Sequence, residues 1–367
     1  MSLIDRLQKS SRIEHVSILT DSKFFNKKDM ITTPVPMLNV ALSGSLDGGL
    51  SPGHTMLAGP SKHFKTSFAL LIASAYLKKY KDAALLFYDS EFGSPQSYFE
   101  SFGIDTDRVL HSPVTNIEEL KFDLIHQMNE LKRGEKVIII IDSIGNVASK
   151  KEVEDALNEK SVADMTRAKA MKSLFRCVTP HLTIKDIPLL TINHTYMEIG
   201  MFPKAIVSGG TGAYYSSDNI WIIGRQQDKV GTEIQGYHFV VNIEKSRFVR
   251  EKSKIPISVS WEGGIEKWSG LLEVALQTGH VIKPKNGWYM PIDPATNKEL
   301  APSNCRAADT MKEEFWKPII DNTDFAEVIR KKFTVAHSPM LQETSEAAED
   351  VPGPVKSLPA IESTIDV

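Results

Sequence analysis

The sequence is poor in cysteine and has neither a long apolar run nor a large net charge. Its 367 residues include two cysteines, Cys177 and Cys305, which stand far apart and form no Cys-x-x-Cys or His/Cys ligand pattern. A chain of this length buries a core without disulfides or a structural metal, so we interpret both as reduced, non-catalytic thiols. The longest aliphatic run, residues 137–141, is too short for a membrane span, and the N-terminal MSLIDRLQKSSR lacks the apolar stretch of a signal peptide. We therefore expect a cytoplasmic protein without membrane attachment.

The small net charge of −3 conceals an uneven distribution. From Gln342 to the C-terminus there are six acids and one base, a net charge of −5, so the rest of the chain carries +2. An acidic tail behind a mildly basic body is compatible with a nucleic-acid partner, although the total charge alone argues against one. The tail from about His337 is rich in Pro, Ser, Glu and Ala and has no periodicity, which predicts disorder.

Short β-branched runs alternate with longer helical patterns between Val35 and about Arg225. This alternation predicts an α/β fold with a mostly parallel sheet, covered by helices on both faces because the strand runs are apolar throughout. Thr115 and Glu118 predict a capping box at the start of one crossover helix. Residues 238–243 and 255–261 predict antiparallel additions to the same sheet. The predicted parallel strands are residues 54–58, 84–88, 136–141, 188–192 and 219–223.

A candidate phosphate-binding loop follows the first predicted strand. It reads Gly59-Pro60-Ser61-Lys62-His63-Phe64-Lys65-Thr66, and Ser67 then leads into an apolar helix. In a strand, turn and helix of this kind, backbone N–H groups and the helix N-terminus bind phosphates. Lys65 would reach the β- and γ-phosphates, and Thr66 would hold Mg²⁺. Phe64 stands where the usual pattern has glycine, so on these residues alone a turn that merely contains Lys-Thr is the alternative.

Two further predicted strands deliver acids to the same edge of the sheet. One ends in Asp142, where a Walker-B carboxylate would act on Mg²⁺, and another is followed closely by Glu91, the candidate general base for an attacking water. Taken singly, each has an ordinary alternative, because apolar runs often end in Asp and Glu91 is also compatible with a helix N-cap.

The order of these motifs resembles the RecA family, and specifically its phage UvsX-type branch. The resemblance extends over nearly the whole chain, from SKFFNKKD at 22–29 to NGWY at 286–289, and in that branch Phe also replaces the glycine of the loop. It implies an ATP- and Mg²⁺-dependent P-loop core at 34–270, an N-terminal assembly extension at 1–33, a C-terminal lobe at 271–336 and an acidic tail at 337–367. The matching segments are GPSKHFKT at 59–66, YDSE at 88–91, Tyr98, FGID at 102–105, VIIIIDS at 137–143 and TINH at 191–194.

The resemblance also implies roles for single residues. Glu91 matches the catalytic glutamate and Tyr98 the ring that stacks on adenine, while His194, after Asn193, matches the sensor of the γ-phosphate. Lys245 and Arg247 match two basic residues that reach the γ-phosphate of the neighbouring protomer in a filament, and Trp268 matches an aromatic residue presented to the neighbour's adenine. Without the resemblance, Lys245 and Arg247 read as a solvated strand edge and Trp268 as a core residue.

Two segments are candidates for binding DNA. Residues 195–218 combine four glycines with Tyr196, Phe202 and Lys204, which suits stacking on single-stranded DNA; a flexible surface loop with its rings in the core is the alternative. By resemblance this is the second DNA loop, with Phe202 as the wedge between bases. The first loop would lie within 151–167, before a helix whose basic residues share one face. The residues on that face are Lys169, Lys172 and Arg176, for which an ordinary solvated face is the alternative, and the candidates for DNA contact are Arg167, Lys169 and Lys172.

The function implied by the resemblance is a DNA-dependent ATPase that forms helical filaments on single-stranded DNA and exchanges strands with a homologous duplex. Its roles would be recombination, repair and recombination-dependent replication in a bacterial host's cytoplasm, with a phage single-stranded-DNA-binding protein and a recombination mediator as further partners. A ring helicase would need a larger N-terminal domain than the short extension before the core. A nucleotide-sensing scaffold would not need the aromatic, basic 195–218 segment.

Overall fold

The structure is a computed structural model that describes residues 2–22, 29–158, 166–201, 203–230, 233–302 and 304–335. The chain divides into two units, 1–335 and 336–367, and the second lies outside the described residues. The predictions of a disordered acidic tail and of a wedge at Phe202 therefore concern residues that the structure does not describe. Residues 23–28 are not described either. Nor are residues 159–165, which belong to the expected first DNA loop.

The described residues contain a nine-stranded sheet in the order β11-β10-β9-β8-β1-β5-β4-β2-β3. The strands from β8 to β3 are parallel neighbours, and β9, β10 and β11 extend the sheet in antiparallel fashion. This confirms the predicted α/β class and each predicted strand. Their bounds are β1 Gly53–Ala58, β2 Ala84–Asp89, β3 Val109–Pro113, β4 Val137–Asp142, β5 Pro188–Asn193, β8 Asn219–Val230, β9 Glu233–Ser246, β10 Lys254–Ser260 and β11 Gly264–Ile265.

One strand, β3, was not expected from the sequence. It pairs with β2 at the end of the sheet, and most of its residues are exposed or half-buried, including His111 and Pro113. Proline is tolerated at a sheet edge because no neighbouring strand needs its N–H. The strand therefore lacks the apolar run that identified the others.

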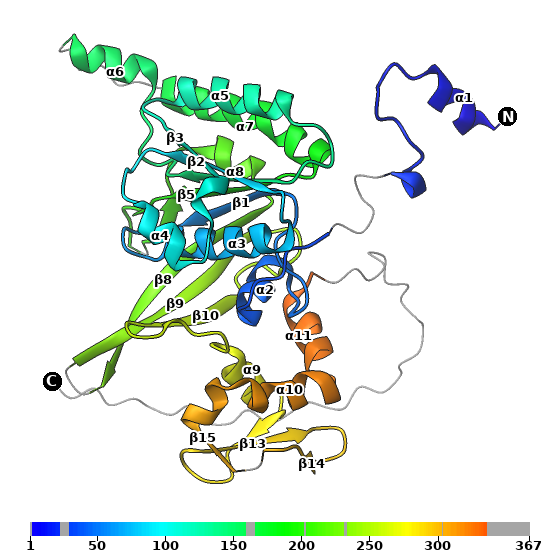
Figure 1. The fold of residues 1–367 in the computed structure, drawn as a ribbon, viewed down its shortest axis with the longest axis vertical. Coiled ribbons are helices and arrows are strands. Elements are labelled where there is room, and N and C mark those ends of the chain that lie inside the picture. Colours follow the sequence, from blue (N-terminus) through cyan, green and yellow to red (C-terminus); the bar gives the residue numbers. More distant parts are fainter. Residues whose placement is uncertain are drawn as a thin grey trace, which may run out of the picture. The chain divides into compact units, whose positions relative to one another are not determined.

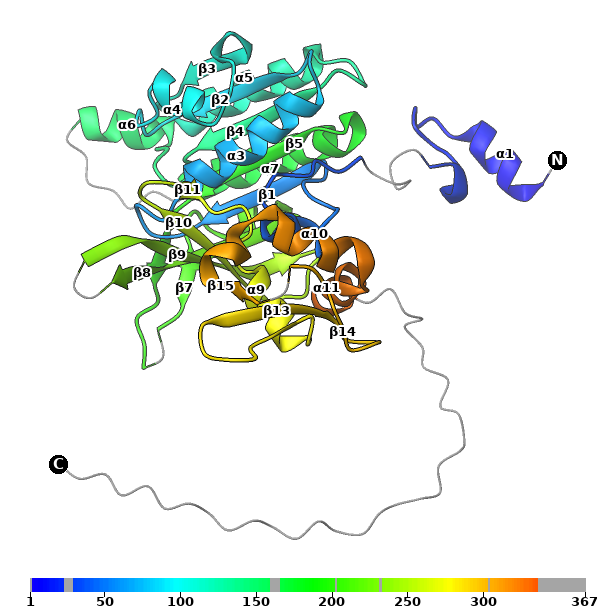
Figure 2. The same ribbon diagram turned by 60° about the horizontal axis from the view of Figure 1, so that its bottom comes forward.

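Helices cover both faces of the sheet (Figure 1). Buried residues of α3 join one apolar cluster with alternate residues of the central strands, and buried residues of α5 and α7 join the other cluster with the intervening strand residues. Figure 1 shows the central strands between α3 on one side and α5 and α7 on the other, and in Figure 2 α3 lies in front of the strands. The helices of this part are α2 Pro36–Ser43, α3 Lys65–Lys79, α4 Gln96–Ser101, α5 Ile117–Glu130, α6 Lys150–Leu157, α7 Thr166–Lys185 and α8 Thr211–Ser216.

Two local predictions need correction. The N-cap of α5 is Asn116, whose side chain accepts from the Glu119 N–H, so the predicted capping box of Thr115 and Glu118 is wrong by one residue. Thr115 instead donates to the Glu119 carboxylate. Residues 195–218 are not one irregular loop, because they contain the antiparallel hairpin of β6 (Thr195–Met197) and β7 (Ala205–Val207) and then α8. The N-terminal extension contains the helix α1 (Leu3–Ser10), which has no buried residue.

A small lobe follows the sheet. Its buried residues, among them Trp316 and Phe325, belong to the same apolar cluster as α3. The lobe consists of α9 Leu271–Gln277, β12 Val281–Ile282, β13 Trp288–Asp293, β14 Lys298–Glu299, β15 Cys305–Arg306, α10 Glu313–Asn322 and α11 Phe325–Phe333.

Among the residues that the structure describes, there is no helix with the length and apolar character that a membrane span requires.

Candidate nucleotide site

The loop between β1 and α3 has the geometry of a phosphate-binding site. Lys65 is the first residue of α3, is only 7% exposed and donates from Nζ to the Pro60 carbonyl at 2.8 Å. The loop thus wraps around its own lysine at a helix N-terminus, where backbone N–H groups favour an anion. Burial lowers the pKa of Lys65, and the nearby Glu91 and Asp142 oppose this shift. A bound phosphate would provide the negative charge that this buried ammonium lacks.

Phe64 caps α3 in the left-handed conformation, with φ of 60°. For a bulky residue this conformation costs on the order of 1–3 kcal/mol. Its ring packs 5.0 Å from that of Phe239 on β9 and 5.8 Å from that of Phe68 on α3. Aromatic pairs contribute about 0.5–1.5 kcal/mol each, so these contacts offset the strain. The unusual residue at this position therefore leaves the loop in phosphate-binding form.

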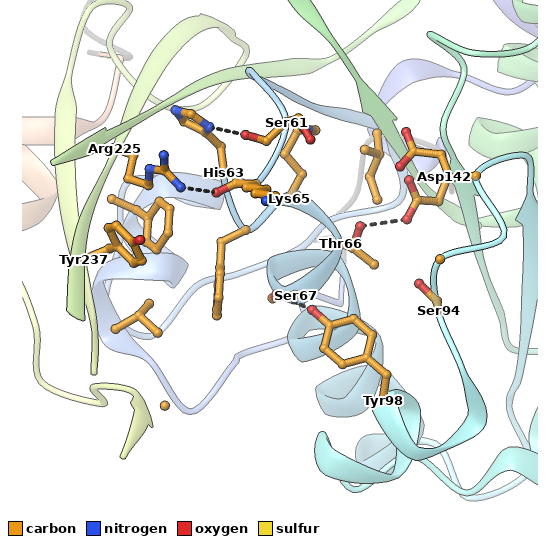
Figure 3. Close-up of a pocket in the computed structure, with 18 of the residues that line it drawn as sticks. Ser61, His63, Lys65, Thr66, Ser67, Ser94, Tyr98, Asp142, Arg225 and Tyr237 are labelled. Carbon is orange, nitrogen blue, oxygen red and sulfur yellow. Dashed lines mark hydrogen bonds between the residues drawn. The ribbon is translucent and has the colours of Figure 1, made fainter. Parts of the chain in front are cut away.

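Thr66 and Asp142 are joined by a hydrogen bond from Thr66 Oγ1 to Asp142 Oδ2 at 2.7 Å (Figure 3). Asp142 is 3% exposed, and its Oδ1 has no hydrogen-bond partner among the described residues. Burial raises the pKa of Asp142 to about 6. A buried carboxylate oxygen without a partner, beside a hydroxyl, is a donor set that suits Mg²⁺. The two residues therefore fit the metal that the sequence predicted.

Glu91 lies at the next strand end, oriented by a turn. Asp89 Oδ1 accepts from the backbone N–H of Glu91 and of Phe92, and the Glu91 carboxylate accepts from His194 Nε2 at 2.9 Å and from Asn146 Nδ2 at 3.1 Å. The bond from His194 is the main reason that the pKa of Glu91 is lowered. The carboxylate is therefore ionised near neutral pH and able to accept a proton. His194 directly precedes β6, so it connects Glu91 to the 195–218 segment.

These residues line one cavity of about 700 Å³, which also contains Tyr98. The Tyr98 hydroxyl is hydrogen-bonded to Ser67 Oγ in the first turn of α3 (Figure 3). Burial raises the pKa of Tyr98, so it stays protonated. The structure thus brings together the loop, Tyr98, Glu91, Asp142 and His194, as the sequence predicted.

Three further residues of the cavity were missed by the sequence reading. Arg225 donates to the Lys62 carbonyl at 3.1 Å and lies 4.7 Å from the ring of Tyr237. Trp261, which is 63% exposed, follows β10 and lies 6.3 Å from Tyr237. Arg225 lies on β8, Tyr237 on β9 and Trp261 directly after β10. The sequence pattern predicted these strands, but it did not indicate that these residues face the phosphate loop.

Lys245 and Arg247 lie at the far end of β9 and have partners within the chain. Lys245 Nζ donates to the carbonyls of Tyr214 and Tyr215, at 3.0 and 3.2 Å, in the last turn of α8. The Arg247 guanidinium lies 2.6 Å from Asp218, just after that helix. Burial lowers the pKa of Lys245. The two cations are therefore held against the end of the 195–218 segment rather than in the cavity of their own chain.

Trp268 is partly buried, and its ring lies 6.4 Å from that of Trp316 in the C-terminal lobe. It does not line the cavity of its own chain. The geometry agrees with the core alternative for this residue, since packing against α10 already explains its burial.

The candidate DNA residues differ in their exposure. Lys169 and Lys172 project from the exposed side of α7, and Tyr196 and Lys204 are exposed on the β6–β7 hairpin. Arg167 does not belong with them, because its guanidinium donates to the carbonyls of Ile144, Gly145 and Val147 in the loop after β4. It stabilises the segment that follows Asp142, and its Nε and Nη2 donate inside the chain.

The chain matches two family models in succession. Residues 3–266 match the RecA N-terminal domain. The chain belongs to the RecA family. Residues 268–329 match the C-terminal domain of the bacteriophage T4 recombination and repair protein. The recombination and repair protein of Enterobacteria phage T4 is 51% identical over 334 residues, which cover 90% of this chain and 85% of that protein.

More distant relatives are bacterial RecA proteins. RecA of Syntrophus aciditrophicus is 25% identical over 291 residues, 78% of each chain, and RecA of Streptomyces rimosus is 24% identical over 346 residues, 90% of this chain and 86% of that protein. The RecA match contains every residue of the cavity described above, and Trp268 stands at the start of the phage-type C-terminal match.

Proposed function

We propose that this chain is an ATP-dependent recombinase that assembles on single-stranded DNA and pairs it with a homologous duplex. Membership of the RecA family and similarity to a phage recombination and repair protein support recombination and repair as its function. The observation that carries the ATPase activity is the convergence of Lys65, Thr66, Asp142 and Glu91 on one cavity.

The chemistry follows from the positions of these groups. Lys65 and the loop N–H groups would bind the β- and γ-phosphates, while Thr66 and Asp142 would hold Mg²⁺, which supplies neutralising charge when bound. Glu91, kept ionised by His194, would take the proton of the water that attacks the γ-phosphate. Because His194 donates to Glu91 and precedes β6, a change at the γ-phosphate would be passed to the 195–218 segment.

The second half of the site would come from a neighbouring copy. Lys245 and Arg247 lie away from their own cavity, so each would serve the nucleotide of the next protomer in a filament. Contacts that form only in the assembled state favour that state by their own free energy. We assign residues 1–33 to assembly. The rest of the chain would consist of an ATPase core at 34–270, a C-terminal lobe at 271–336 and an acidic tail at 337–367.

DNA would bind along the exposed residues of α7 and the β6–β7 hairpin. Lys169 and Lys172 would contact phosphates, and Tyr196, Phe202 and Lys204 would contact the unpaired strand. A single-stranded-DNA-binding protein and a mediator that loads the recombinase are the further partners that we infer. Arg167 is left out of this surface because of its carbonyl contacts.

The test is ATP hydrolysis with and without single-stranded DNA, with electron microscopy of the same samples. The proposal expects hydrolysis that DNA stimulates and helical filaments on the DNA. Closed rings would instead indicate a helicase-type motor, and filaments that form equally without DNA would indicate a scaffold.

A further inference from the structure

The cavity extends beyond its phosphate loop into an aromatic region. Phe64 lies between these two parts, because its backbone belongs to the loop and its ring is half-buried against Phe239 on β9. Both residues line the cavity, together with Tyr237 of the same strand. The buried side of the Phe64 ring thus has a rigid support, and its remaining surface borders the cavity.

Two rings flank the first turn of α3. Phe64 is the residue that caps this helix, and Ser67, three residues later, is bonded to the hydroxyl of Tyr98. Phe64 and Tyr98 both line the cavity, one near each end of this turn. Figure 3 shows Tyr98 beside Ser67 and Tyr237 on the other side of the loop. If the phosphates bind at the N-terminus of α3, the nucleoside that is bonded to them must occupy the rest of the same cavity.

We propose that the Phe64 ring contacts the base of the bound nucleotide, in addition to Tyr98, to which the resemblance already assigns a base contact. This inference rests on the proposed ATP binding. The loop itself gives no reason for a phenyl ring at this position, since glycine adopts a φ of 60° without strain. A flat apolar surface with a rigid support binds a flat base by stacking, and it favours a purine over a pyrimidine because a purine has the larger surface.

The experiment compares two ligands that share the phosphates and differ in the base. Calorimetry measures the affinity of Mg-ATP and of Mg-tripolyphosphate for the full chain, without DNA, in the wild type and in Phe64→Gly and Phe64→Leu. Glycine keeps the loop conformation, and leucine keeps the apolar contact with Phe239 but has no flat ring. Both variants are expected to bind ATP about 10-fold more weakly, a typical loss for one base stack, and to bind tripolyphosphate within about 2-fold of the wild type.

Phe122→Ala, which removes an exposed ring from α5, is the matched control and should change neither affinity. The leucine variant should also bind ATP and CTP with more similar affinities than the wild type does. Unchanged ATP affinity in both variants would overturn the proposal, as would equal losses for ATP and tripolyphosphate, which would mean that Phe64 only shapes the loop. If the wild type bound neither ligand, the proposed function itself would fail.

Discussion

The phosphate-loop cavity and the far end of β9 hold their charged groups in opposite ways. In the cavity, Asp142 has a buried oxygen without a partner among the described residues, and Lys65 has a carbonyl where an anion would be expected. At the end of β9, Lys245 and Arg247 are bonded to two carbonyls of α8 and to Asp218. The first region is arranged for a ligand, whereas the second is satisfied by its own chain.

If the chain assembles as proposed, this difference indicates which contacts assembly would have to change. For Lys245 to reach a neighbour's phosphate, its ammonium must leave or share the carbonyls of Tyr214 and Tyr215 at the end of α8. Helix α8 completes the 195–218 segment that we assign to DNA. Nucleotide bound between two protomers and DNA bound at this segment would therefore both affect the hydrogen bonds of Lys245.

The largest effect is expected from a substitution in the phosphate loop. Lys65→Ala removes the buried ammonium that would bind the β- and γ-phosphates, and loss of one such group reduces turnover by about 10²–10³-fold or more. ATP hydrolysis by the full chain with single-stranded DNA measures this. Lys78→Ala, an exposed lysine in the last turn of the same helix, is the control and should retain turnover. Retained hydrolysis in Lys65→Ala would mean that the loop is not the phosphate site.

A smaller effect is expected at His54, which lies near Lys245 and the end of α8. His54 on β1 is fully buried, bonded to Thr191 and to Ser217 after α8, and stacked on Phe175. Burial lowers its pKa to about 3. Because the unfolded chain binds a proton below about pH 6.5 and the folded chain does not, stability is lost as the pH falls from 6.5 toward 3.

Between pH 7 and pH 5 this histidine should lower the free energy of unfolding by about 2 kcal/mol. Urea unfolding of the wild type and of His54→Gln at both pH values gives the difference, since the glutamine variant lacks the titrating ring. The same pH dependence in both proteins would contradict the assignment.

The smallest effect is expected from the acidic tail. Its net charge of −5 would compete with DNA for a body of +2, so a chain ending at Met340 should bind single-stranded DNA a few-fold more tightly at low salt, and the gain should shrink as salt is added. Fluorescence anisotropy across a salt series measures this. Identical affinities for both chains at every salt concentration would rule out competition by the tail.

The sequence predicted the parts of the site whose positions follow from residues close by in the sequence. The loop at 59–66, Asp142 and Glu91 follow apolar strands directly, so their meeting at one sheet edge follows from parallel pairing. Arg225, Tyr237 and Trp261 reach the cavity through the antiparallel pairing of β8, β9 and β10, a tertiary contact with no local signal. Arg167 was named as the end of the expected first DNA loop and Trp268 by resemblance, and the structure gives both of them partners inside the chain.

In the proposed filament, one ATP site is built from two copies of the chain. A mixture of Lys245→Ala and Glu91→Gln separates the two halves of that site, because the first variant lacks the cation that would reach the neighbouring protomer's nucleotide and the second lacks the general base. Each variant alone should hydrolyse ATP poorly on single-stranded DNA, and an equal mixture should recover part of the activity. Recovery is expected because some contacts between protomers then bring the intact Glu91 of one copy together with the intact Lys245 of its neighbour. A mixture no more active than the average of the two variants would contradict the shared site.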